Sequence, residues 1–133
     1  MATHHDGHPV GRTVGQVKVM LFNVADEAAD IEAAYHTISR ELAGVPGLLG
    51  NELLRSVVDA RQFVVLSTWS DIAAFNAWEQ GADHKRDTAP LRPFRDPGAS
   101  RPFGIYQVTT AYGHAAATGA EPVTAGAAAG TGR

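Results

Sequence analysis

Residues 62–78 read QFVVLSTWSDIAAFNAW, and within this stretch the hydrophobic pattern changes its period. Residues 62–69 are rich in β-branched and aromatic side chains and are apolar on both faces at their centre, which predicts a buried strand. Ser70 or Asp71 can then cap a helix, because both side chains accept hydrogen bonds from free backbone N–H groups. The apolar stripe predicted for this helix consists of Ile72, Phe75, Trp78 and Ala82.

Outward from this strand and helix, the sequence contains more segments of the same two kinds. Residues 14–24, 48–58 and 103–112 are predicted as strands, and residues 59–61 as a tight connection. Asp26 can cap a helix whose apolar stripe consists of Ile31, Tyr35, Ile38 and Leu42. The resulting order is βαββαβ, in which both helices cover one face of a four-stranded antiparallel sheet. This arrangement is a ferredoxin-like α+β fold.

The second face of the predicted sheet also needs a cover. Strands 14–24 and 62–69 are apolar on both faces, whereas a sheet face that meets water normally carries polar side chains. A second copy of the same sheet is the simplest cover. We therefore expect a homodimer with the geometry of a dimeric α+β barrel.

Composition sets the limits of the folded domain. Residues 114–133 are mostly Ala, Gly and Thr, and residues 1–12 lack an apolar core, so both ends are expected to be disordered. One domain at residues 13–113 remains. Residues 83–102 are charged and rich in proline, and we expect a short helical turn followed by an irregular loop at 89–102. A loop of this length would serve as a lid or a pocket rim.

Charge and composition argue against several classes of function. The 133 residues carry a net charge of −3 and show no basic patch of the kind that binds nucleic acid. No apolar run approaches the roughly 18 residues of a membrane span, and the first residues do not resemble a secretory signal. A cytoplasmic protein is therefore expected. The chain has no cysteine, which excludes thiolate chemistry, and no metal site is expected.

The segment 65–78, VLSTWSDIAAFNAW, resembles the antibiotic biosynthesis monooxygenase family. Members typically end the third strand with a tryptophan, here Trp69, and have an aromatic residue six positions later, here Phe75. A second tryptophan or a histidine often follows three residues beyond, here Trp78. The sequence GLLG at 47–50 is similar to the family's usual start of the second strand. The resemblance covers nearly the whole predicted domain and implies the same fold and a dimer.

The resemblance also implies a pocket between the sheet and the helices. In the quinone-forming and haem-degrading members, an asparagine of the first strand and a tryptophan of the second helix line this pocket. Asn23 and Trp78 hold those places here. Haem degraders also need a histidine as the axial iron ligand, at a place that Thr88 occupies in this chain, and His84 lies four residues earlier.

Quinone-forming members work without flavin or metal, so that a deprotonated, electron-rich substrate reacts directly with O2. By resemblance, Asn23 would hold a phenolic or keto oxygen, and Arg86 or Arg92 would supply a fixed positive charge. His84 would act as the base, because imidazole exchanges protons near neutral pH. The expected walls for a small aromatic substrate are Trp69, Phe75, Trp78, Phe22 and Leu66.

Each of these residues also has a plain structural role open to it. Asn23 can begin the turn before the first helix, and the two tryptophans can belong to the core. His84 and Arg86 lie in the charge run at 83–87, which is typical of a solvated helix face with arginine–aspartate pairs.

The leading hypothesis is therefore a cofactor-independent monooxygenase acting on an aromatic or polyketide-like secondary metabolite. A cofactor-free cyclase or isomerase is one alternative, because it too needs a stabilised enolate in an apolar pocket. A haem-binding or haem-degrading protein and a non-catalytic small-molecule binder are the others. Oxygen consumption separates the first hypothesis from the cyclase and the binder, and an absorption band separates it from the haem protein.

Overall fold

A computed structural model describes residues 8–9, 13–81 and 83–113. The chain divides into two compact units, residues 15–108 and residues 1–14 with 109–133. In the second unit, the described residues form β1 (His8–Pro9) and β6 (Tyr112–Gly113), which pair antiparallel. The other residues of the two predicted disordered ends lie outside the described part of the chain. The main sheet, the helices and the candidate site all belong to residues 15–108.

The main sheet has four antiparallel strands in the order β3-β4-β2-β5, which confirms the predicted ferredoxin-like α+β class. The strands are β2 (Val17–Val24), β3 (Leu48–Arg55), β4 (Gln62–Trp69) and β5 (Phe103–Gln107). β2 and β4 lie at the centre, and their pairing runs without a break from Val17 opposite Trp69 to Val24 opposite Gln62. This register places the apolar centres of both strands side by side.

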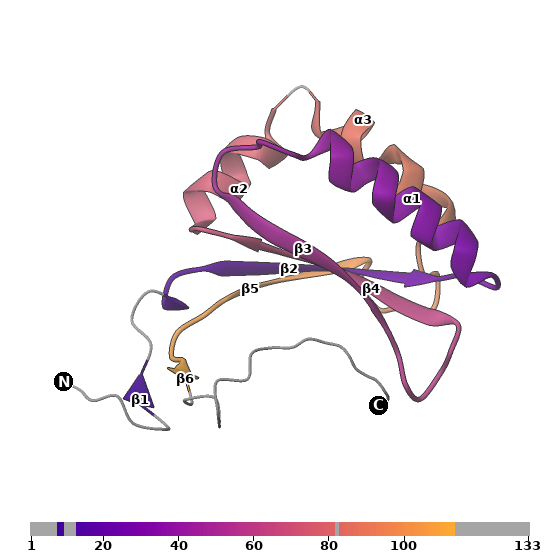
Figure 1. The fold of residues 1–133 in the computed structure, drawn as a ribbon, viewed down its shortest axis with the longest axis horizontal. Helices are drawn as coiled ribbons and strands as arrows, with labels where there is room; N and C mark the ends of the chain where they lie inside the picture. The colour runs from indigo at the N-terminus through magenta and orange to yellow at the C-terminus, as the bar shows by residue number, and fades with distance from the viewer. Residues whose placement is uncertain (1–7, 10–12, 82, 114–133) are drawn as a thin grey trace, which may run out of the picture. The chain divides into compact units, whose positions relative to one another are not determined.

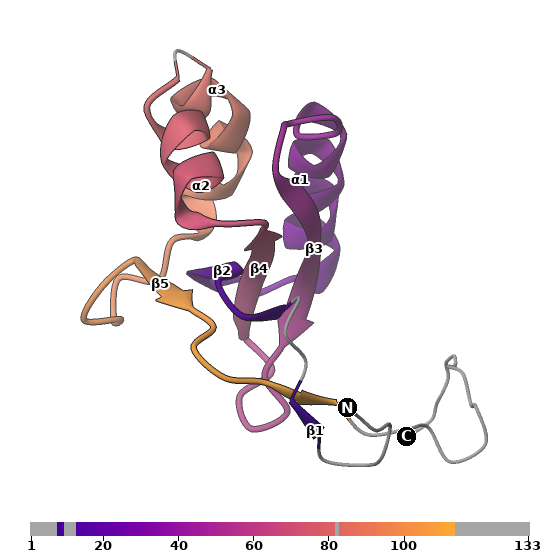
Figure 2. The same ribbon diagram turned by 90° about the vertical axis from the view of Figure 1, so that its left-hand side faces the viewer.

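The helices all lie on one face of this sheet, as Figures 1 and 2 show. They are α1 (Ala28–Glu41), α2 (Ile72–Glu79), the short α3 (His84–Thr88) and the 3-10 helix η2 (Ala89–Phe94). α1 stands beside the stack of α2 and α3 in Figure 2. The structure thus replaces the first half of the irregular loop expected at 89–102 with a helix. No helix in the described ranges is long and apolar enough to cross a bilayer.

The two long helices begin in different ways. The Asp71 carboxylate accepts a hydrogen bond from the Ala74 N–H at 2.8 Å, so it caps α2 as expected. The cap predicted at Asp26 was wrong, because α1 begins after Glu27, whose side chain makes no cap hydrogen bond. The Asp26 carboxylate instead binds the Arg61 guanidinium at 2.9 Å, and this pair ties the start of α1 to the β3–β4 turn.

The core lies between the sheet and the helices in two clusters. One joins Ile31 and Ile38 of α1 to Phe63 and Val65 of β4 and to Leu91 of η2. The other cluster consists of Val17, Val19, Trp69 and Phe75. The predicted stripe of α1 is largely buried, whereas in α2 Phe75 is buried and Ile72 is 41% exposed. Ala82, the last member of the α2 stripe, lies outside the described residues.

The predicted fourth strand, 103–112, is broken into two. β5 ends at Gln107, and the last sheet-like hydrogen bonds join Val108 to Gly15 and Gln16. Gly15 has φ of +92°, a conformation that favours glycine and turns the chain out of the sheet direction. β2 therefore begins only at Val17.

Gly47 fixes the start of β3 beside α2. Its φ is +84°, and a Cβ added there would collide with the side chain of Ala74. Its carbonyl accepts the N–H of Ser70 at 2.8 Å. The GLLG segment is therefore a close-packing position, where glycine lets the strand approach the helix.

Candidate active site

A cavity of about 200 Å³ lies between the helix-bearing face of the sheet and the helices. Residues from β2, β3, β4 and β5 line one side, and residues from α1, α2, α3 and η2 line the other. Its surface is mainly apolar, with a few polar side chains, which is the usual character of a small-molecule site. Phe103 and Ile105 of the edge strand line it while remaining 44% and 39% exposed, so its opening lies along β5.

Three aromatic side chains form one wall of the cavity. The ring centroids of Trp69 and Trp78 are 5.3 Å apart, and Phe75 lies 5.5 Å from the first and 6.1 Å from the second. Trp69 is only 1% exposed, and its Nε1 donates to the Ser67 hydroxyl at 3.0 Å. The expected grouping of these three residues is therefore present, with Trp69 also serving the core.

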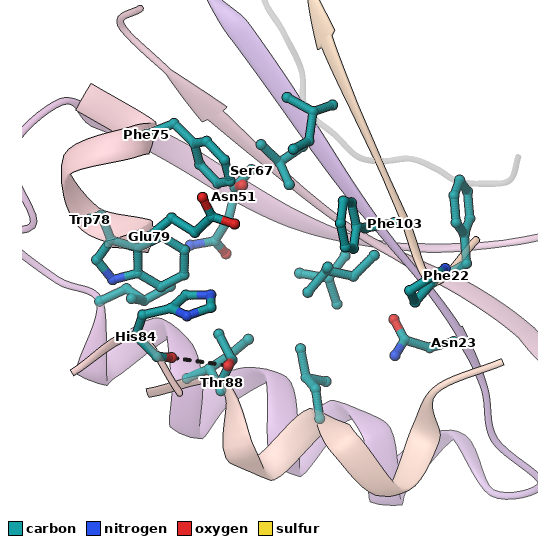
Figure 3. Close-up of a pocket in the computed structure, with 18 of the residues that line it drawn as sticks. Phe22, Asn23, Asn51, Ser67, Phe75, Trp78, Glu79, His84, Thr88 and Phe103 are labelled. Carbon is teal, nitrogen blue, oxygen red and sulfur yellow. Dashed lines mark hydrogen bonds between the residues drawn. The ribbon is translucent and has the colours of Figure 1, made fainter. Parts of the chain in front are cut away.

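Asn23 is buried at the opposite end of the cavity from Trp78 (Figure 3). It is 4% exposed, and its Oδ1 has no hydrogen-bond partner among the described residues. The Nε1 of Trp78 is likewise buried without a partner in the described part of the chain. A buried polar atom without a partner costs about 1–3 kcal/mol. Both residues line the same cavity, one at each end.

His84 lies against Trp78 at the same end of the cavity (Figure 3). The two ring centroids are 4.6 Å apart and the rings meet edge to face. Thr88, one turn further along α3, also lines the cavity, and its hydroxyl donates to the His84 carbonyl at 3.0 Å. The imidazole is therefore close enough to the cavity to exchange a proton with a bound molecule.

Of the two arginines considered for the positive charge, the structure brings one to the cavity. Arg86 does not line this cavity, because its guanidinium lies between Asp83 at 3.3 Å and Asp87 at 3.4 Å on α3. Arg92 does line it, and its Nη2 donates to the Lys85 carbonyl at 2.8 Å. The charge run at 83–87 thus behaves partly as the solvated helix face that its sequence suggests.

Of the other two expected wall residues, Phe22 borders the cavity with its ring turned away from Asn23 (Figure 3), and Leu66 does not border it. Successive side chains of a strand point to opposite faces of the sheet. Val65 and Ser67 point into the cavity, so Leu66 belongs to the face away from the helices, where it borders a separate hollow with Lys18 and Thr68.

Comparison with known proteins identifies the family of this chain. The sequence profile of the family described as antibiotic biosynthesis monooxygenase matches residues 17–87, more than half of the chain. The chain belongs to the antibiotic biosynthesis monooxygenase family. The resemblance stated from residues 65–78 is thereby confirmed.

Solved structures share the fold of this family member at low sequence identity. A variant of SnoaB, a cofactor-independent oxygenase from Streptomyces nogalater, superposes with a TM-score of 0.58 and 21% identity. That match covers 71% of this chain and 94% of SnoaB. The haem-degrading protein Rv3592 from Mycobacterium tuberculosis gives a TM-score of 0.51 and 24% identity, over 70% of this chain and 89% of the other.

A sequence relative of this family member is protein SchA from Streptomyces halstedii, which is 29% identical over 77 residues. The match covers 57% of this chain and 20% of SchA. The chain therefore spans only a small part of the length of this relative.

Several residues that line the cavity of this monooxygenase-family protein are not among the sequence predictions. Asn51 and Ser67 are opposite each other in the β3–β4 register, and Glu79 follows Trp78 on α2. The alternation of β3 could have indicated Asn51, because Leu53 on the same face is apolar and part of the core. Nothing local indicates Arg95, which joins the cavity through a bridge between its backbone and that of Asn23.

Within the ranges that the structure describes, no three His, Asp or Glu side chains are grouped so that they could hold a metal ion. The polar groups available to the cavity are therefore amides, hydroxyls, an imidazole, one carboxylate and two guanidinium groups.

Proposed function

We propose that this protein is a cofactor-independent monooxygenase that oxidises an electron-rich aromatic substrate of the phenol or anthrone type. The observation that carries the proposal is the aromatic-walled cavity with the buried, unpartnered amide of Asn23 in it. An amide can accept a hydrogen bond from a phenol or donate one to its anion. A preorganised donor of this kind favours the anion, which is the form that reacts with oxygen.

The proposed reaction needs no electron donor other than the substrate. A base removes a proton from the substrate, and the resulting anion transfers an electron to O2. The two radicals then join through a new C–O bond, and the hydroperoxide loses water. For an anthrone the methylene becomes a carbonyl, while its two hydrogens and the second oxygen atom leave as water. The roles of the protein are to bind and orient the ring, stabilise the anion and exclude water.

Within this proposal several residues that line the cavity have defined roles. Asn23 holds the ionising oxygen, and Arg92 adds positive charge at the rim. His84 accepts the proton, since its ring already borders the cavity. The ring of the substrate packs against the aromatic wall formed by Trp69, Phe75 and Trp78. Arg86 and Leu66 have no part in it, because neither lines the cavity.

The test is oxygen uptake by the metal-stripped protein with a simple anthrone, followed with quinone formation. We expect Asn23→Ala to lower kcat by about 100-fold, the usual effect of losing one oxyanion-stabilising donor. Asn76→Ala is the matched control, because Asn76 is exposed on α2 and does not line the cavity. Uptake that is equal in the two variants would contradict the role of Asn23. Ring closure or isomerisation without oxygen uptake would favour the cyclase alternative.

The size of the cavity favours a small aromatic molecule over a haem. Its volume of about 200 Å³ lies below the roughly 300–1,000 Å³ typical of sites for drug-sized ligands, and a haem is larger than these. His84, the nearest candidate ligand, has its ring packed against Trp78. An absorption spectrum of the protein titrated with haem tests this conclusion, because a strong Soret band would contradict it.

We further propose that the protein acts as a homodimer. The sheet face away from the helices carries the apolar side chains of Met20, Val64 and Leu66 at its centre, half-buried. The strand alternation places them on the side opposite the cavity. A second copy of the same face would bury them without adding any other partner.

A further inference from the structure

The cavity differs in charge between its two ends. Figure 3 shows Asn23 at one end, and Glu79, His84 and Trp78 at the other, with Phe103 between them. Glu79 provides the single carboxylate among the described residues that line the cavity. Arg95 is joined to the Asn23 end by an antiparallel backbone bridge between the two residues. The backbone of Arg95 therefore lies beside the Asn23 end of the cavity, and the carboxylate of Glu79 lies at the Trp78 end.

Arg95 differs from the other two arginines in what its guanidinium contacts. Arg86 is paired with two aspartates outside the cavity, and one nitrogen of Arg92 is held by the Lys85 carbonyl. Within the described ranges, the Arg95 side chain makes no hydrogen bond or ion pair, and the residue lines the cavity while staying exposed. The next residue, Asp96, borders a separate hollow, and its Oδ1 accepts the Gly98 N–H at 2.8 Å.

The position of Arg95 is fixed by the backbone. The N–H of Asp96 donates to the Phe22 carbonyl at 3.1 Å, and the N–H of Arg95 donates to the Arg92 carbonyl at 3.2 Å. These bonds hold the segment after η2 against the end of β2. An arginine held beside a buried, unpartnered amide is suited to bind a planar anion, because the guanidinium fork matches the two oxygens of a carboxylate.

We propose that Arg95 determines substrate choice by binding a carboxylate, so that the natural substrate is an aromatic acid. The carboxylate lies against Arg95, next to the ring oxygen that Asn23 holds, and the uncharged part of the ring system extends past Phe103 towards Trp78. This inference rests on the proposed function for the identity of the aromatic substrate. The carboxylate proposal adds an acidic group to that substrate. It also fixes the direction in which the substrate binds, because Glu79 repels an anion at the other end of the cavity.

The test is calorimetric titration of the full chain with two probes, 3-hydroxy-2-naphthoate and 2-naphthol, near pH 7. They share the ring and the hydroxyl and differ in the carboxylate. We expect the wild type to bind the naphthoate about tenfold more tightly, since one partly exposed charge-assisted contact is worth roughly a factor of ten. Arg95→Gln should remove this preference, and Arg95→Lys should keep part of it. The preference should also shrink as salt is raised.

Arg101→Gln is the matched control, because Arg101 is exposed and does not line the cavity. Equal binding of the two probes by the wild type, or an unchanged preference in Arg95→Gln, would overturn the carboxylate site. If the wild type still oxidises an uncharged anthrone in that case, the proposed oxygenase function stands. A naphthoate preference that depends on Arg95, in a protein that consumes no oxygen, would instead overturn the oxygenase and leave the acid-binding site.

Discussion

The ring centroids of Trp69 and Trp78 are 5.3 Å apart in one aromatic wall, but the two indole nitrogens differ in their hydrogen bonds. Trp69 donates to Ser67, whereas Trp78 has no partner for Nε1 among the described residues. Trp69→Phe should therefore lower the free energy of unfolding by about 2 kcal/mol, through lost packing and a lost hydrogen bond. Trp78→Phe should cost less than about 1 kcal/mol, because it also removes an unsatisfied donor, and it should lower oxygen uptake. Urea unfolding of the two variants checks this, and an equal or larger cost at Trp78 would contradict it.

At the scale of the elements, α1 and α2 differ in how their first turns are satisfied. Asp71 caps α2 through the Ala74 N–H, whereas Glu27 at the start of α1 makes no side-chain bond. We expect Asp71→Ala to lower the free energy of unfolding by about 1 kcal/mol, the usual effect of losing an N-cap. Glu27→Ala should cost no more than about 0.5 kcal/mol, because it loses only an interaction with the helix dipole. Urea denaturation measures both, and a loss at Glu27 equal to that at Asp71 would refute the assignment.

At the scale of the whole molecule, the proposed dimer would form through the sheet face away from the helices. Leu66 lies on that face and does not line the cavity, so Leu66→Glu should separate a dimer into folded monomers by burying unpaired charge in the interface. Ile72→Glu is the control, because Ile72 is already 41% exposed on α2, on the helix side of the sheet. Light scattering after size exclusion gives the mass, and circular dichroism checks the fold. A monomeric wild type, or a Leu66→Glu variant that stays dimeric, would rule out this interface.

The sequence by itself determined the order of the elements, the fold class and the family. Hydrophobic period is a local property, and the change from period two to helical spacing after Trp69 predicts the bounds of β4 and the start of α2. The predicted stripe ran on to Ala82, whereas α2 ends at Glu79. The cap at Asp71 is equally local, because it involves an N–H only three residues away. The aromatic wall was expected from the family resemblance of residues 65–78, in which Trp69 ends a strand and Phe75 and Trp78 lie on the helix.

Only the tertiary structure decided which polar residues share the cavity. Asn23 and Arg95 are distant in sequence, and backbone bonds of the segment after η2 bring them together. Arg86 was expected in the site, but the phase of α3 turns it to Asp83 and Asp87. Spacing can give the face of a helix or strand, but it cannot give the path of a connecting segment. That path depends on hydrogen bonds between distant residues, which form only when the whole domain folds.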